Sequence, residues 1–306
     1  MTTKALELIS KVKDFANLDV STEDVFILRR LNDVQWALYN MNYHWKPLEG
    51  YPTCSTTSAV SYVAIPSTVS IIYDVRQTSS APYATLRYVD PGRFHTVIPQ
   101  PTAYTNQKPV YYTLWGGRIW LYPIPDATYT LTLFAYLKPV NMKVYQNSSA
   151  TLATTSTISA ATAAFASNSN VDTSMYFAYD ADIRSDGTYP WSSISAVSSN
   201  SSLGISVYGG AGSSGAATCA SPASFNEDFD LAMVYGTLLQ SAVKFGEIKE
   251  RLTFFQAEYD RQLSALIKTN AKQPSYKPVA REFDANGDQP FLGDYEAKFP
   301  FVKENL

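Results

Sequence analysis

The apolar residues of this chain change their spacing twice along its length, from helical to alternating and back to helical. They recur every three or four residues over 6–16 and 26–41, alternate over much of 60–137, and return to the helical spacing over 231–266. The last run is the strongest periodic pattern in the sequence. Helical ends around an alternating middle predict an α+β fold, in which the terminal helices pack together as a hub and the β region projects between them.

Capping signals set the limits of the two N-terminal helices. The first run breaks at residues 17–20. Ser21 then has the character of an N-cap for the second helix, because Glu23 and Asp24 follow in the first turn, where the helix dipole favours carboxylates. The second helix is expected to end near Tyr43.

The C-terminal helical run begins at Asn226. Gly246 is a candidate break between two helices, since glycine costs about 1 kcal/mol in a helix interior. The run is expected to end by Asn270, because Pro274 cannot continue a helix.

The clearest local signal is an aromatic hairpin at residues 111–122. Two aromatic-rich runs flank the pair Gly116 and Gly117, which is typical of a two-residue hairpin turn. Alternating runs over 60–64, 69–75, 83–89 and 128–137, separated by prolines, extend the pattern. Residues 51–146 are therefore predicted to form an antiparallel, sandwich-like β region.

Residues 147–223 differ in composition from the rest of the chain. Ser, Thr, Ala and Gly dominate, and neither Lys nor Glu occurs. Short strand-like pieces remain at 175–179, 194–197 and 203–208, which pure low complexity would lack. The prediction is an inserted β-rich segment; disorder throughout is the alternative, because large apolar residues are few.

The end of the chain, 271–306, follows neither period but combines prolines with aromatic residues. Disordered tails usually lack aromatics, so this segment is predicted to be an extended arm that docks either on its own domain or on a neighbouring chain. The predicted organisation is thus a helical hub of 1–50 and 224–270, a β region at 51–146, an insertion at 147–223 and an arm at 271–306. The candidate interface residues of the arm are Tyr276, Phe283, Phe291, Tyr295, Phe299 and Phe301.

Composition supports a protein that works through interfaces. Charged residues make up only 17% of the 306 positions, against about 25% ordinarily, while aromatics reach 14% with 22 tyrosines. Tyrosine is enriched and Lys and Glu are depleted at interface cores. Lys and Arg number 24 and Asp and Glu 27, a net charge of −3, which argues against a nucleic-acid binder and a polybasic membrane-surface protein.

Targeting and cross-linking signals are weak. No apolar stretch reaches the length of about 18 residues that a membrane span needs, and the N-terminus is amphipathic rather than a signal peptide. Cys54 and Cys219 lie far apart, so neither a disulfide framework nor a cysteine zinc site is expected.

Three patterns resemble ligand sites. Residues 210–215 match G-x-G-x-x-G, but Pro222 leaves no room for the helix that a dinucleotide site requires. Residues 284–288 begin like a calcium loop, yet position twelve is Tyr295 rather than Glu. Asp180, Asp182 and Asp186 could cluster in a metal-binding turn, although a solvated turn is the commoner reading. We expect no cofactor and no metal.

Catalytic groups are also scarce. The two histidines, His44 at a helix end and His95 in a strand region, have no nearby partners in the sequence, and no G-x-S-x-G elbow occurs. The sequence therefore predicts that the protein is not an enzyme. The hairpin aromatics could instead form a ligand platform, but core and interface positions are favoured, since half of an alternating strand usually faces the core. These residues are Tyr111, Tyr112, Trp115, Trp120 and Tyr122.

The hairpin and its continuation resemble a known family. Residues 118–127, reading RIWLYPIPDA, and residues 129–133, reading YTLTL, are similar to the "LYPxPD…YTLTL" hairpin of head-to-tail adaptor proteins of short-tailed bacteriophages. Lys138-Pro139 and the acidic, aromatic residues 225–229 occupy the places of the following connection and helix start, and residues 29–32 are compatible. The resemblance covers 1–145 and 224–270, and the 147–223 insertion is not part of the pattern.

The resemblance implies a structural protein of the virion at the head-to-tail junction, present in the host cytoplasm during assembly. It implies a twelve-subunit ring below the portal protein that carries tail nozzle or tail fibre proteins and lets DNA pass as cargo, with no membrane contact. The C-terminal arm would run to the portal or to a neighbouring subunit. The alternative is a carbohydrate- or ligand-binding β module of a virion or surface protein, based on the aromatic strands and the aspartates at 180–186.

Overall fold

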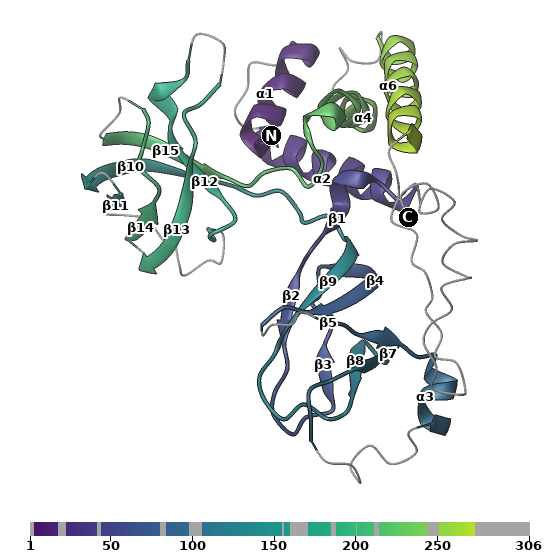
Figure 1. Ribbon diagram of the computed structural model, residues 1–306. Helices are drawn as coiled ribbons and strands as arrows, with labels where there is room; N and C mark the ends of the chain where they lie inside the picture. Colours follow the sequence, from purple (N-terminus) through teal and green to yellow (C-terminus); the bar gives the residue numbers. More distant parts are fainter. Residues whose placement is uncertain are drawn as a thin grey trace, which may run out of the picture. The chain divides into compact units, whose positions relative to one another are not determined.

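The computed structural model describes residues 3–17, 23–41, 44–79, 84–97, 106–154, 156–159, 171–184, 188–199, 201–210, 214–242, 244 and 251–272. The chain divides into two compact units. One combines Met1–Pro47 with Pro139–Gln273, and the other contains Leu48–Lys138. Figure 1 shows helices, a barrel and further sheets, so the predicted mixture of α and β structure is confirmed.

Helices from both ends of the chain pack together in the first unit. They are α1 (Ala5–Ala16), α2 (Asp24–Asn40), α4 (Asp230–Ser241) and α6 (Leu252–Lys272), with a 3-10 turn at Glu227–Phe229 before α4. Residues 232–238 of α4 are all buried, as expected for a helix that neighbours surround. The surrounding helices approach closely at Gly236, where a Cβ atom would lie 2.9 Å from Val34 and 3.0 Å from Tyr259.

The helix limits differ in detail from the sequence prediction. Helix α2 begins at Asp24 and ends at Asn40, before the predicted end near Tyr43, while Ser21 lies outside the described residues. Helix α6 continues to Lys272, past the predicted end at Asn270, and Gly246 is again outside the described residues. Such differences of a few residues are ordinary, because helix ends fray.

A buried carboxylate joins the first and fourth helices. Asp230 lies in the first turn of α4, where the helix dipole stabilises a negative charge, and its side chain is only 5% exposed. Its Oδ2 atom accepts hydrogen bonds from Lys11 Nζ at 2.5 Å and from Thr3 Oγ1 at 2.6 Å. Nearby, the fully buried Trp45 donates to the carbonyl of Leu38 at 2.7 Å.

Two sheets form the second unit. One has the order β1-β9-β4-β5, with β2 also paired to β9; the other has the order β3-β8-β7-β6. Both sheets contribute to one core, so the unit is a sandwich as predicted, except that β6 and β7 pair in parallel. The bounds are β1 Glu49–Gly50, after a 3-10 turn at Lys46–Leu48, β2 Thr53–Ser55, β3 Tyr62–Ala64, β4 Val69–Gln77, β5 Ala84–Thr85, β6 Arg87–Tyr88, β7 Tyr111–Trp115, β8 Arg118–Tyr122 and β9 Thr130–Leu137.

The predicted hairpin is confirmed as β7 and β8. Gly116 and Gly117 have φ angles of +59° and +71°, the left-handed conformation that a type I′ turn requires at both central positions. The prediction of a strand around His95 is wrong, because Pro91–Val97 forms the short helix α3. Proline at the first helical position and the Asp90 carboxylate, which accepts from the Gly92 amide at 2.9 Å, both favour this helix start.

The Ser-, Thr- and Ala-rich insertion forms a closed six-stranded barrel in the first unit, with strand order β10-β11-β14-β13-β12-β15. The bounds are β10 Val144–Thr154, β11 Thr157–Ser159, β12 Tyr176–Tyr179, β13 Ser192–Ser199, β14 Ser202–Ile205 and β15 Ser214–Ala220, with a 3-10 turn at Asp180–Asp182. The prediction of strands in this segment is confirmed. Closure itself was not predicted.

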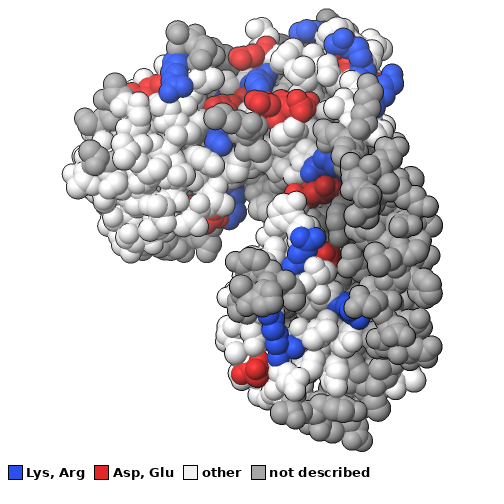
Figure 2. Space-filling view, viewed as in Figure 1, with Lys and Arg blue, Asp and Glu red and all other residues white. Residues whose placement is uncertain are grey.

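The barrel is continuous with the start of the first helix. The Ala5 amide donates to the carbonyl of Ser221 at 3.0 Å, and the Ala223 amide donates to the carbonyl of Thr3 at 2.9 Å. The face of the barrel visible in Figure 2 consists almost entirely of uncharged residues, in agreement with the composition of its sequence.

Candidate interaction surfaces

The six aromatic residues that sequence analysis assigned to an interface all lie in the C-terminal segment, outside the described residues. The same holds for the calcium-like run at 284–288. The other sequence-derived candidates fall inside the described part, and the structure separates them.

The aromatic residues of the hairpin divide between the two faces of their sheet. Tyr112 points into the sandwich core and is 3% exposed. On the opposite face, a smaller apolar cluster forms around the buried Phe94 of α3, and Tyr111, Trp120 and Tyr122 pack against it. Most of the hairpin aromatics are therefore structural, as the sequence analysis favoured.

The end of the hairpin keeps an exposed aromatic surface. Trp115 is 63% exposed beside the turn. The Arg118 guanidinium lies 4.2 Å from the centre of the Tyr62 ring, and Tyr62 in turn contacts Trp120 at a ring distance of 5.3 Å. We call Tyr62, Trp115, Arg118 and Trp120 the hairpin surface. Trp, Tyr and Arg are the residues that most often dominate binding energy at protein interfaces.

The aspartates of the suspected metal turn are bonded to hydroxyl groups instead. Asp180 accepts from Thr218 Oγ1 at 2.7 Å, and Asp182 accepts from Tyr208 Oη at 2.7 Å. Asp186 lies outside the described residues. Within the part of the chain that the structure describes, no group of three or more His, Cys, Asp or Glu side chains is placed to hold a metal.

The remaining sequence patterns do not converge on one site. His44 is exposed, and its backbone has a φ angle of +46°. The glycine run at 210–215 leads into strand β15, not a helix, so it lacks the geometry of a dinucleotide site. Burial raises the pKa of Cys54 to about 11 and that of Cys219 to about 12, which keeps both thiols protonated at neutral pH.

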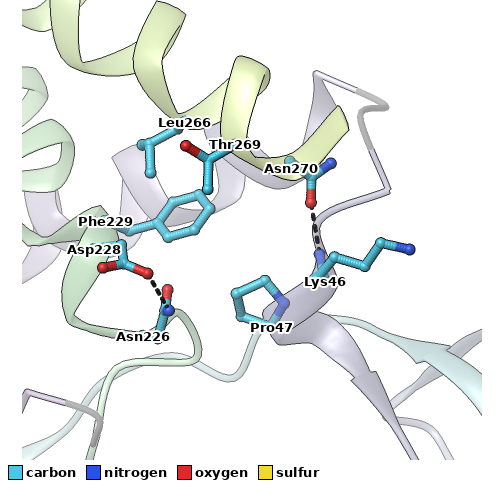
Figure 3. Close-up of a pocket in the computed structure, with 8 residues that line it drawn as sticks. All are labelled: Lys46, Pro47, Asn226, Asp228, Phe229, Leu266, Thr269 and Asn270. Atoms are coloured by element: carbon cyan, nitrogen blue, oxygen red, sulfur yellow. Dashed lines mark hydrogen bonds between the residues drawn. The ribbon is translucent and has the colours of Figure 1, made fainter. Parts of the chain in front are cut away.

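A small cavity lies among the helices of the first unit (Figure 3). Its volume is about 260 Å³, and Phe229, Leu266 and Pro47 form its apolar wall. Hydrogen bonds close two sides: Asn270 Oδ1 accepts from the Lys46 amide at 3.0 Å, and Asn226 Nδ2 donates to Asp228 at 2.7 Å.

A larger cleft of about 720 Å³ lies between the N-terminal segment and the barrel, and sequence analysis did not single out its residues. The aromatic side chains of Tyr189 and Trp191 line it, with their rings 5.3 Å apart. Trp191 Nε1 donates to Glu7 Oε1 at 2.8 Å. The sequence signal was Tyr189-Pro190-Trp191, an aromatic group inside a Ser-rich segment.

Burial and neighbouring charges shift the pKa values of Lys4 and Tyr189 in the cleft. Lys4 is 9% exposed, and its amine lies 3.6 Å from the centre of the Tyr176 ring. Burial lowers the pKa of Lys4, while the nearby Glu7 carboxylate partly opposes that shift. Burial also raises the pKa of Tyr189, with smaller contributions from the negative charges of Asp180 and Glu7.

Comparison with known proteins defines the class to which this structure belongs. A sequence model of phage adaptor proteins matches residues 3–186, which is more than half of the chain, and makes it a structural adaptor component of a bacteriophage virion. The chain belongs to the SU10 adaptor protein family. The match includes residues 147–186, which corrects the expectation that the whole insertion, 147–223, lies outside the family pattern. The matched region ends before 224–270, the second segment of the expected resemblance.

Other comparisons add little. No curated protein sequence matches this chain. Among solved structures, that of the flagellar hook junction protein FlgK from Burkholderia pseudomallei aligns with 81% of this chain and 60% of its own, at 11% identity and a TM-score of 0.14. This chain thus spans less than two thirds of that protein, and a likeness at that TM-score carries no argument. No helix of the described residues is long and apolar enough to cross a membrane.

Proposed function

We propose that the protein is a subunit of a closed ring below the portal of a short-tailed phage, where it joins the portal to tail nozzle or tail fibre proteins. Family membership is the observation that carries this proposal. The hairpin surface supports it, because a solvent-exposed Trp115 beside Arg118 and Tyr62 has the composition of an interface that a partner covers.

The ring is expected to have twelve subunits, and DNA passes through it as cargo. The net charge of −3 supports a ring that lets DNA pass without binding it tightly. A basic channel would instead bind duplex DNA, because Lys and Arg release counterions from the phosphates. Purified protein should therefore show no tight, salt-sensitive binding of duplex DNA. A binding constant that falls steeply with salt would contradict this part of the proposal.

The protein acts as a scaffold without catalysing a reaction. In support, Asp180 and Asp182 are engaged by hydroxyl donors within the barrel. The raised pKa values of Cys54 and Cys219 make poor nucleophiles of both thiols. An activity that survives purification and is lost on changing a single polar residue would argue for an enzyme.

The segment 271–306 serves as an arm that contacts the portal or a neighbouring subunit through its aromatic residues. A chain that ends at Lys272 tests this role, since it keeps helix α6 whole and retains the bond between Asn270 and the Lys46 amide. We expect this truncated protein to fold and to assemble poorly. Loss of folding would show that the arm belongs to the subunit's own core.

Electron microscopy of particles, together with mass measurement of the protein mixed with its portal, tests the assembly directly. The double variant Trp115→Ala, Arg118→Ala should fold normally and form fewer rings, because it removes two of the four side chains of the hairpin surface. Val207→Ala, at a 75% exposed position of the barrel unit, is the matched control. A protein absent from particles, or monomeric beside its portal, overturns the proposal.

A further inference from the structure

We infer that the cleft between the N-terminal segment and the barrel is a binding site for a neutral oligosaccharide, with Tyr189 and Trp191 as the surface on which a sugar ring packs. This activity goes beyond the adaptor role and does not depend on it. The site differs from the one that the hairpin aromatics and the aspartates at 180–186 suggested. Four of the five hairpin aromatics pack in apolar clusters, and Asp180 and Asp182 accept hydrogen bonds from hydroxyl groups within the barrel unit.

The cleft has the size of a ligand site. Pockets that bind small molecules usually enclose about 300–1,000 Å³, and the cleft, at about 720 Å³, falls within that range. The cavity among the helices, at about 260 Å³, does not. Of these two hollows, the cleft is therefore the one that can accept two or three sugar units.

The aromatic surface is fixed in place before any ligand arrives. The indole N–H of Trp191 is already bonded to Glu7, which restricts the orientation of the ring, and the side chain is partly exposed. A tight turn around Pro190, closed by a 2.9 Å bond from the Trp191 amide to the carbonyl of Tyr189, sets the two rings beside each other. Rigid aromatic side chains lose little conformational entropy on binding.

The polar groups of the cleft match a ligand with many hydroxyls and no net charge. Two basic residues, Lys4 and Arg184, are balanced by two acidic ones, Glu7 and Glu227. A phosphate or other anion would meet both carboxylates, whereas a sugar hydroxyl both donates and accepts hydrogen bonds. The exposed Thr188 adds a hydroxyl-bearing side chain to the lining, whereas the hydroxyls of Ser192 and Ser206, which also line the cleft, make hydrogen bonds within the barrel unit.

Sugar rings combine these two requirements in one molecule. Their C–H faces pack on aromatic rings, and their hydroxyls lie around the edge, where polar side chains can reach them. A peptide would satisfy the apolar part of the cleft through its side chains. Its backbone donors and acceptors lie along an extended chain, whereas the hydroxyls of a sugar surround the same ring that packs on the aromatic surface.

The experiment uses the purified full-length protein. Maltotriose, cellotriose and chitotriose are tested by saturation-transfer NMR and calorimetry, and a bacterial polysaccharide array extends the panel. We expect at least one neutral glycan to bind. Trp191→Ala should weaken that binding about tenfold or more, because it removes the packing face. Arg184→Ala should weaken it about threefold, through the loss of a donor.

Trp115→Ala, a change at an exposed tryptophan of the other unit, should leave glycan binding unchanged. Circular dichroism establishes that each variant is folded, and Arg184, an exposed side chain, keeps the test valid if Trp191→Ala unfolds. If neither the trisaccharides nor any glycan on the array binds, the inference is overturned. Binding restricted to charged glycans overturns it too, as does a peptide of residues 271–306 that binds only when Trp191 is present and that no glycan displaces.

Discussion

The six-stranded barrel and the two-sheet sandwich are both built mainly from antiparallel strands, but they protect their backbone groups differently. None of the six barrel strands contains a charged residue, whereas the sandwich strands include Glu49, Asp74, Arg76, Arg87 and Arg118. A barrel has no edge strands, so it needs no charges to block pairing with other chains. The sandwich ends in very short strands, and two of its edges carry Glu49 and Arg87.

Their cores differ as well. The barrel interior is organised by aromatic contacts, with Phe177 5.1 Å from Tyr179 and 5.9 Å from Tyr208 between ring centres. The sandwich core is mainly aliphatic, with Leu131 and Leu133 fully buried between its two sheets. The absence of charged residues from the barrel strands contributes to the low charge of the whole chain, because strands in a closed barrel tolerate Ser and Thr on their outer faces.

Removing one large core side chain from each structure should give the largest effect and show whether the two unfold separately. Phe177→Ala in the barrel should lower the free energy of unfolding by about 3–5 kcal/mol, and Leu133→Ala in the sandwich by about 2–5 kcal/mol, through lost packing and the remaining cavity. Hydrogen exchange read by mass spectrometry should rise over 144–220 in the first variant and over 48–138 in the second. Exchange that rises in both regions at once would show that they unfold together.

The next effect concerns the Tyr208 hydroxyl, which makes two hydrogen bonds inside the barrel unit. Tyr208 Oη accepts from the Tyr179 amide at 3.0 Å and donates to Asp182, and burial raises the pKa of Tyr208. Tyr208→Phe should cost about 1–3 kcal/mol in chemical denaturation, because a buried amide loses its acceptor. Tyr129→Phe is the matched change in the sandwich, where the hydroxyl bonds an exposed Asp126, and it should have little effect. Equal costs would remove this distinction between the two structures.

The hairpin turn should need glycine at position 117 for its backbone conformation and not for lack of space. A Cβ atom at Gly117 would meet nothing within 4 Å, but its φ angle of +71° is unfavourable for other residues. Gly117→Ala should therefore cost about 1–2 kcal/mol, measured as a shift of the denaturation midpoint. Gly209→Ala, at an equally open position of the barrel unit without a positive φ angle, should be nearly neutral. A neutral Gly117→Ala would mean that the turn relaxes.

The smallest effect should appear in the reactivity of the two thiols. Cys54 is half-buried in the sandwich and has a pKa of about 11, whereas Cys219 is buried in the barrel and has a pKa of about 12. Both should react slowly with iodoacetamide at pH 8, and Cys54 should react first as the pH rises toward 11. Because both pKa values are raised above the ordinary value of 9.0, the folded state holds these thiol protons more tightly than the unfolded state does. The contribution of the two thiols to the stability of the fold is therefore complete below about pH 9 and falls as the pH rises further. Rapid labelling of Cys219 at pH 8 would indicate that the barrel opens.

Local patterns allowed much of the fold to be predicted. The pair Gly116 and Gly117 predicted the hairpin because two consecutive residues with positive φ favour glycine. The helical spacing predicted α1 and α2, since amphipathic periodicity is a property of the local sequence. The segment around His95 was predicted wrongly, because a helix of seven residues, about two turns, is too short to show a period.

The candidate site was harder to foresee. Tyr189 and Trp191 are far in the sequence from Glu7, and only the tertiary fold brings Glu7 to the indole N–H. Asp180 and Asp182 were noticed as a possible metal turn, but their hydroxyl partners, Thr218 and Tyr208, come from other parts of the barrel. A local sequence pattern cannot show these hydrogen bonds, because the two partners of each bond lie far apart in the sequence.

The sequence by itself determined the order of helical and β segments, the position of the hairpin and the charge-poor composition of residues 147–223, because each depends on neighbours along the chain. Only the tertiary structure decided that the charge-poor strands close into a barrel. Closure depends on β10 pairing with β15, strands that lie far apart in the sequence, and the free energy of such pairing comes from a shared core that no single strand encodes. The bonds that join Ala5 to Ser221 and Ala223 to Thr3 hold the barrel beside the N-terminal segment, where the cleft lies.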